Sequence, residues 1–205
     1  MNRSLRYPLP AVAAGLLLLA CAAGQSPAPA GSLHLDADRS TLTATAIKNE
    51  TKPVAVHFPG LSGWADPAGG VAELEIPLLS LATGDASRDF NVRTLLFEAD
   101  HARFATARFR LAKVDADLGG LAGGLTLTAQ AHGTLSLHGA DLALDGPISL
   151  WKDGGSVTAT LGQGWSVAIT KTSLVAALAN LNQHCPQPHR VGNEVALSGT
   201  LVFVP

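Results

Sequence analysis

The sequence predicts an all-β fold, in which most of the 205 residues form an antiparallel β-barrel. Apolar and polar residues alternate with period two in several stretches, which is the pattern of strands with one buried face. Pairs of glycines separate these stretches and supply turn positions with positive φ. Strands do not alternate regularly with helices, as they would in βαβ units. A barrel is therefore favoured over an α/β fold.

The composition agrees with one folded domain. Hydrophobic residues make up 47% of the chain and charged residues 15%, which excludes a disordered tail. The net charge of −2 argues against nucleic acid as a partner. A chain of this length can bury a core large enough to fold without a disulfide or a structural metal.

The longest alternating stretch predicts one strand over residues 125–138. Leucine, alanine and glycine occupy one face, and threonine, serine, glutamine and histidine occupy the other. Such a long strand suits a tilted barrel better than a sandwich. Shorter strands are expected at 33–35, 41–47, 54–58, 72–78, 105–111, 142–144, 148–150, 157–161, 166–170 and 194–204.

Two segments break the alternation and predict short helices. Residues 87–99 place Phe90, Thr94 and Phe97 at helical spacing. Residues 173–181 place four apolar side chains in the same way. We expect no other helix in the barrel domain.

The N-terminus has the pattern of a signal peptide. Arg3 and Arg6 precede an apolar run over residues 11–20, which ends at Cys21. This run is too short for a membrane span, which needs about 20 apolar residues. We therefore predict that residues 1–20 are removed.

Residues 18–21, Leu-Leu-Ala-Cys, resemble the lipobox of bacterial lipoproteins. The resemblance implies that Cys21 is lipidated, becomes the first residue of the mature chain and anchors it to the membrane. Ala22 then favours a periplasm-facing lipoprotein of the outer membrane, because aspartate at this position tends to hold lipoproteins at the inner membrane. The alternative is a plain secretory peptide that happens to contain a cysteine. The Pro, Gly and Ala of residues 21–31 predict a tether ahead of a barrel domain at 32–205.

Motifs of the common enzyme classes are absent from the sequence, so we predict no catalytic residues, no metal and no cofactor. One cluster, His184, Cys185 and His189, could hold zinc or copper, but its prolines are typical of a turning polar loop. Lipidation of Cys21 leaves Cys185 as the remaining cysteine. In an oxidising compartment its thiol could pair between two molecules and form a homodimer.

Several further segments carry a resemblance to a known family. They read SLATG at 80–84, RD at 88–89, VR at 92–93, LF at 96–97, FATARF at 104–109 and GTLSLHG at 133–139. These motifs resemble those of the YceI-like family of secreted, lipid-binding β-barrels, and they cover most of residues 33–204. Three positions depart from the family pattern: Arg39 replaces a histidine, Leu96 a phenylalanine and Ala105 a proline.

The resemblance implies an up-and-down, lipocalin-like β-barrel of about eight strands with two short helices. It also implies that the protein binds, and transports or stores, a polyisoprenoid or another long apolar lipid in the bacterial cell envelope, without catalysis. Two alternatives stay open. A barrel whose core is filled would indicate an envelope scaffold or a partner-binding module, and histidines and aspartates converging in one cleft would indicate an enzyme of an unrecognised kind.

We expect apolar strand faces to line the lumen. Parity alone does not say which face is inside, so the resemblance makes that choice, and Phe90 and Phe97 would share one face of the first helix at the mouth. The predicted ligand-binding residues are Leu42, Val56, Phe58, Ile76, Phe90, Phe97, Phe109, Leu127, Leu135 and Ile169. Arg88 and Arg93 have two interpretations: pairing with Asp89 at the start of the helix, or binding an anionic head group at the mouth.

Overall fold

The computed structural model describes residues 27–118, 123–185 and 190–205, and antiparallel strands dominate it. The strands are β1 (Leu33–Leu35), β2 (Thr41–Lys48), β3 (Lys52–His57), β4 (Ser62–Asp66), β5 (Val71–Pro77), β6 (Thr106–Val114), β7 (Thr126–Leu137), β8 (Ala140–Asp153), β9 (Ser156–Leu161), β10 (Ser166–Ala168) and β11 (Val191–Val204). The helices are α1 (Ala86–Asn91), which continues into a π-helical turn at Val92–Leu96, and α2 (Val175–His184). Short 3-10 turns lie at Leu78–Ser80, Ala102–Phe104 and Ile169–Lys171. The predicted all-β class is confirmed.

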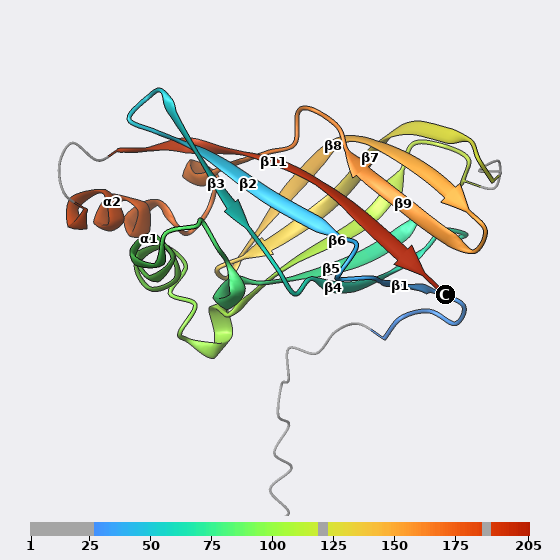
Figure 1. Ribbon diagram of the computed structural model, residues 1–205, viewed down its shortest axis with the longest axis horizontal. Helices are drawn as coiled ribbons and strands as arrows, with labels where there is room; N and C mark the ends of the chain where they lie inside the picture. Colours follow the sequence, from blue (N-terminus) through green and yellow to red (C-terminus); the bar gives the residue numbers. More distant parts are fainter. Residues whose placement is uncertain (1–26, 119–122, 186–189) are drawn as a thin grey trace, which may run out of the picture.

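The strands close into an eight-stranded antiparallel barrel (Figure 1). β1 and β2 are successive parts of one bent strand along β11, and β9 and β10 are successive parts of another. β3 and β4 continue one another in the same way, pairing with β2 and β1 respectively. Each bent or straight strand therefore pairs with the next one along the chain, and β11 closes the ring against the first. This is the up-and-down connectivity that the family resemblance implies.

β7 and β8 form the longest hairpin, which pairs without interruption from Thr126 and Trp151 to Leu137 and Ala140. Only two residues connect them, His138 with φ 51° and Gly139 with φ 78°. Positive φ at both positions is the requirement of a type I′ turn, whose twist matches that of the strands. The predicted strand at 125–138 is confirmed as β7.

β8 is one strand where the sequence predicts two short ones, at 142–144 and 148–150. Leu142 and Leu144 point inward, and the same alternation continues through Gly146 to Ile148 and Leu150. The residues between the two predicted strands therefore keep the register of the pairing with β7. Gly146 and Pro147 hide the alternation in the sequence, but they do not break the strand.

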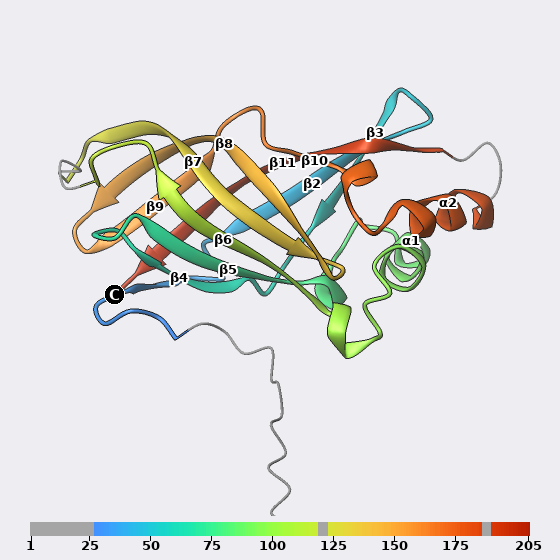
Figure 2. The ribbon, with the colours of Figure 1, turned by 180° about the vertical axis from the view of Figure 1, so that it is seen from behind.

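Both helices lie at one end of the barrel, and the C-terminus lies at the other, as the two opposite views show (Figures 1 and 2). Asp85 caps α1, because its side chain accepts a hydrogen bond of 2.9 Å from the backbone N–H of Arg88. α2 packs against the π-helical turn that follows α1. The two predicted helices, at 87–99 and 173–181, are therefore present with shifted ends.

We call this the helical end, and we call the opposite end, with the β4–β5 and β8–β9 turns, the rim end. His138 joins the β7–β8 turn to the helical end. Its ring stacks on Phe104 with centroids 3.8 Å apart. Its Nε2 lies 3.2 Å from a Glu98 carboxylate oxygen, and its Nδ1 lies 3.0 Å from the Ser173 hydroxyl. No helix within the described ranges is long and apolar enough to cross a membrane.

Candidate functional site: an apolar cavity in the barrel

The barrel encloses a cavity of about 130 Å³ with an apolar wall. Inward-facing side chains of the strands form this wall, and every lining residue except Asp66 is apolar or glycine. The lining residues are Leu42, Ala65, Asp66, Pro67, Gly70, Val71, Ala72, Leu74, Ile76, Phe109, Leu111, Val114, Leu118, Ala131, Leu135, Leu144, Ile148, Leu150, Val157, Ala159, Leu161, Trp165, Leu197, Leu201 and Phe203. A charged group in this space would lose its hydration without gaining a partner, so the cavity suits hydrocarbon.

Two aromatic rings line the middle of the cavity. Phe109 and Trp165 meet edge to face, with centroids 5.9 Å apart and planes at 80°. The indole N–H of Trp165 donates a 2.7 Å hydrogen bond to the carbonyl oxygen of Pro147 and so offers no polar group to a ligand. A Cβ on Gly146 would lie 2.6 Å from the indole ring, so this glycine makes the room for Trp165. Trp165 both packs in the core and lines the cavity.

The cavity reaches the rim end of the barrel. Its lining includes Asp66, Pro67 and Gly70 from the β4–β5 turn region, together with Leu118 beyond β6. At the helical end, buried side chains such as Leu174 fill the space and are not part of the lining. The rim end is therefore the candidate entrance for an apolar molecule.

The structure brings part of the predicted lumen set together. Leu42, Ile76, Phe109 and Leu135 line the cavity. Five other predicted residues pack in or against the core but do not line the cavity. They are Val56, Phe58, Phe97, Leu127 and Ile169. Phe90 points away from the core, with 59% of its surface exposed, at the helical end.

Arg88 and Arg93 also lie at the helical end, where both contact protein groups. The Arg88 guanidinium lies 3.6 Å from the Asp85 carboxylate. Arg93 donates hydrogen bonds to two backbone carbonyl oxygens, those of Leu79 at 3.1 Å and Asp89 at 3.2 Å. Neither arginine belongs to the cavity lining.

Sequence reasoning missed several lining residues that share a strand face with predicted ones. Leu74 lies between Ala72 and Ile76 on the inner face of β5, and Leu144 follows the same parity on β8. Their alternation is visible in the sequence, so extending each predicted face along its whole strand would have found them. The lining at Pro67 and Leu118 carries no such signal, because both lie outside the strands.

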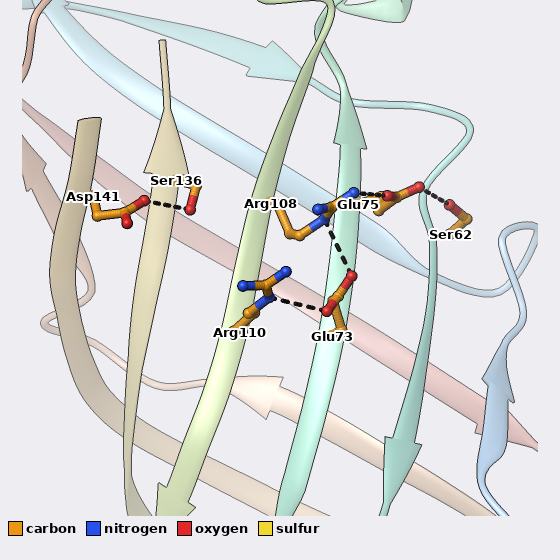
Figure 3. Close-up of polar contacts among 7 residues, drawn as sticks. All are labelled: Ser62, Glu73, Glu75, Arg108, Arg110, Ser136 and Asp141. Carbon is orange, nitrogen blue, oxygen red and sulfur yellow. Dashed lines mark hydrogen bonds and ion pairs between the residues drawn. The ribbon is translucent and has the colours of Figure 1, made fainter. Parts of the chain in front are cut away.

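The outer wall of β5 and β6 carries a network of ion pairs (Figure 3). Glu73 is only 2% exposed and lies 3.1 Å from both the Arg108 and the Arg110 guanidinium groups. Arg108 also contacts Glu75 at 2.6 Å. Trp64 on β4 is the cross-strand partner of Glu73. These charges face away from the cavity, so they stabilise the wall rather than bind in the lumen.

Among the described residues, Asp66 is the one titratable group that lines the cavity, so titratable groups of this part of the chain do not converge there. Among the described residues, no group of three His, Cys, Asp or Glu is placed to hold a metal. Cys185 follows α2 directly and is half-buried. His189 of the sequence cluster and the predicted lipidation site Cys21 lie outside the described residues.

The match to a family model decides to which family this barrel belongs. A model described as YceI-like domain matches residues 33–203. The chain belongs to the YceI-like family. Its matched region begins and ends with β1 and β11, the two strands that close the ring.

Several solved structures resemble this YceI-like chain, including the following two. A polyisoprenoid binding domain from Saccharophagus degradans, described as implicated in plant cell wall breakdown, is 25% identical with a TM-score of 0.73, and the match covers 84% of this chain and 98% of that domain. BcnA of Burkholderia cenocepacia is 20% identical with a TM-score of 0.61, covering 82% of this chain and 98% of the other. The second likeness concerns the fold alone. No curated protein matches the sequence significantly.

The YceI-like motif at residues 80–93 stabilises the helical end. Asp89 accepts hydrogen bonds from the backbone N–H and the hydroxyl of Thr83, at 2.7 and 2.6 Å. The hydroxyl of Ser80 donates to the carbonyl oxygens of Pro59 and Pro77, at 2.5 and 2.8 Å. These bonds fix the loop between β5 and α1, so the motif positions the helices that close the barrel.

Proposed function

We propose that this YceI-like barrel binds the apolar chain of a polyisoprenoid or a similar lipid in its cavity. The observation that carries the proposal is the cavity wall, in which Asp66, at the rim end, is the one charged residue within the described ranges. The likeness to a polyisoprenoid binding domain supports the same ligand class.

The energetics of the proposal need only the hydrophobic effect. Each buried CH₂ group contributes about 0.8 kcal/mol. About ten such groups supply around 8 kcal/mol before ordering costs, the scale of a micromolar dissociation constant. The aromatic rings of Phe109 and Trp165 add contact area in the middle of the cavity. Binding of this kind requires no catalytic group.

We also propose that the protein acts in the cell envelope as a periplasm-facing lipoprotein, most simply at the outer membrane. Arg3, Arg6 and the apolar run at residues 11–20 support export. The Leu-Leu-Ala-Cys segment at residues 18–21 supports lipidation at Cys21. In this setting, transport or storage of the lipid follows from reversible binding in the cavity. A Cys185-linked homodimer is compatible with the half-exposed position of that thiol after α2.

Mass spectrometry of the organic extract from purified protein tests the ligand directly. We expect a long-chain isoprenoid or acyl lipid that is absent from an extract of an unrelated protein purified in parallel. Titration of delipidated protein with prenyl alcohols and fatty acids of increasing length should give affinities that rise with chain length. Folded protein that yields no lipid and binds none in titration would contradict the proposal and favour an envelope scaffold.

A further inference from the structure

The chain enters the barrel at the rim end, beside the cavity. β1 is the first strand, and Leu33 pairs with Ala65, which lines the cavity. His34 pairs with Val204 at the end of β11, so the first strand begins at the edge of the ring opposite the helices. A tether joined to this strand therefore attaches next to the cavity entrance.

The length of the tether limits how far this entrance can lie from an anchor. Eleven residues, 22–32, separate Cys21 from Leu33. An extended chain spans at most about 3.3–3.6 Å per residue, so the rim end lies within about 40 Å of a lipidated Cys21. The helices lie at the end of the barrel opposite β1 (Figure 1).

The rim end also exposes the side chains that membrane interfaces favour. Trp151 is 41% exposed on the outer face of β8, next to Thr126 at the start of β7. Leu125, directly before β7, is 60% exposed. Tryptophan is enriched at the boundary between water and lipid because its ring is apolar and its N–H is polar.

The charges near this end select among membrane surfaces. Asp66, Asp117 and Asp153 lie in or beside the rim turns, and Lys152 is their basic neighbour on β8. Lys113 at the same end pairs with Asp115. Acidic groups outnumber basic ones there, so an anionic lipid surface would repel the rim end and a zwitterionic surface would not.

From these observations we infer that the rim end docks on a zwitterionic bilayer surface through Trp151 and Leu125, and that the cavity takes up apolar chains directly from that bilayer. This inference rests on the proposed function. It assigns the membrane itself as the partner that loads the cavity and the rim end as the docking surface.

The helical end supplies an internal comparison. Phe90 and Val175 are as exposed as the rim residues, at 59% and 50%. Buried leucines, including Leu174 and Leu178, separate them from the cavity. Exposure alone therefore does not make a loading surface, and the two ends can be tested against each other by matched substitutions.

The experiment measures retinol, a fluorescent isoprenoid alcohol, moving from vesicles of phosphatidylethanolamine and phosphatidylcholine into the mature protein. We expect the double variant Trp151→Ser, Leu125→Ser to slow this transfer about tenfold, because two apolar contacts with the bilayer are lost. The dissociation constant for retinol added from solution should stay unchanged, which also shows that the variant is folded. The double variant Phe90→Ser, Val175→Ser should transfer at the wild-type rate.

Two further measurements separate docking from ligand binding. Phosphatidylcholine brominated on its acyl chains should quench the fluorescence of the wild-type protein without retinol present, and the quenching should disappear in Trp151→Phe. Replacing a third of the lipid by phosphatidylglycerol should slow transfer. Wild-type transfer by the rim variant, slowed transfer by the helical-end variant, or absent quenching would overturn the inference. Wild-type protein that is quenched but binds no retinol from solution would refute the proposed function and, with it, direct loading.

Discussion

The ring of Phe109 occupies the space in which a side chain on Gly133 would have to lie. The two residues are diagonal neighbours on strands β6 and β7, because Gly133 pairs with Leu111 and Phe109 pairs with Leu135. A Cβ on residue 133 would also lie 2.5 Å from the carbonyl oxygen of Arg110. A backbone oxygen cannot rotate away as a flexible side chain can, so the requirement for glycine here is strict.

We therefore predict that Gly133→Ala destabilises the protein by about 1–3 kcal/mol and displaces Phe109 into the cavity. Urea unfolding should show the lower stability, and titration should show weaker binding of long prenyl alcohols. Gly123→Ala is the matched control, because nothing lies within 4 Å of the added Cβ. Equal stability of the two variants would contradict the packing argument.

A charge in the lumen should abolish lipid binding, whereas the same charge outside should not. Leu144 lines the cavity, and its neighbour Ala143 faces outward on the same strand. Leu144→Glu must desolvate a carboxylate against hydrocarbon, which costs several kcal/mol. Ala143→Glu should retain wild-type affinity. Circular dichroism distinguishes lost binding from lost fold, and Leu144→Phe, which fills the cavity without charge, should weaken binding in a folded barrel.

Removing the buried carboxylate of the outer wall should weaken the barrel without changing its lumen. In Glu73→Gln, the Arg108 and Arg110 guanidinium groups face a neutral amide, and we expect a loss of about 1.5–3 kcal/mol of stability. Asp141→Asn is the control, since Asp141 is exposed and bonds only Ser136 among the residues of Figure 3. Retinol affinity should be unchanged in both variants. A loss no larger than that of the control would show that the network contributes little.

Asp85 should make part of the stability depend on pH. The hydrogen bond from the backbone N–H of Arg88 holds the pKa of the Asp85 carboxyl below its ordinary value. A lowered pKa in the folded state stabilises the protein above the ordinary pKa, and this contribution is lost as the pH falls through the lowered value. Asp85→Asn should therefore be less stable than wild type at pH 7 and approach it at an acid pH below the lowered pKa. Urea unfolding at both pH values tests this, and an identical difference at both would contradict it.

Membrane attachment should depend on one cysteine. Cys21→Ala removes the predicted lipidation site, so we expect the protein to move from the membrane fraction to the soluble periplasmic fraction. Cys185→Ala is the matched control and should stay with the membranes. A Cys21→Ala protein that remains in the pellet after a carbonate wash would refute the lipid anchor.

The architecture could be predicted from the sequence because most of it repeats one local rule. Alternation over 125–138 follows directly from a strand with one buried face, and β7 appears almost as predicted. The family resemblance then decided that the apolar face lines a lumen. Leu42, Ile76, Phe109 and Leu135 were found in this way.

The position of the cavity along the barrel could not be predicted in the same way. Whether a lumen side chain packs in the core or lines free space depends on which end the helices fill, and that is a property of the closed ring. Phe97 and Ile169 share the apolar pattern of the lining residues but pack outside the cavity. Phe90 fits the helical spacing equally well, yet α1 presents it to solvent.

The pairing of His34 with Val204 also governs when the barrel can form. When the chain emerges with its N-terminus first, the β4–β5 and β7–β8 hairpins can form as soon as both strands of each hairpin have emerged. The ring cannot close until β11 is present, because β11 holds both β2 and β9. Until then these two strands each keep an unpaired edge, which favours pairing with other chains. A chain arrested before residue 191 should therefore aggregate unless a chaperone covers those edges, and the 14 residues of β11 set the pace of maturation.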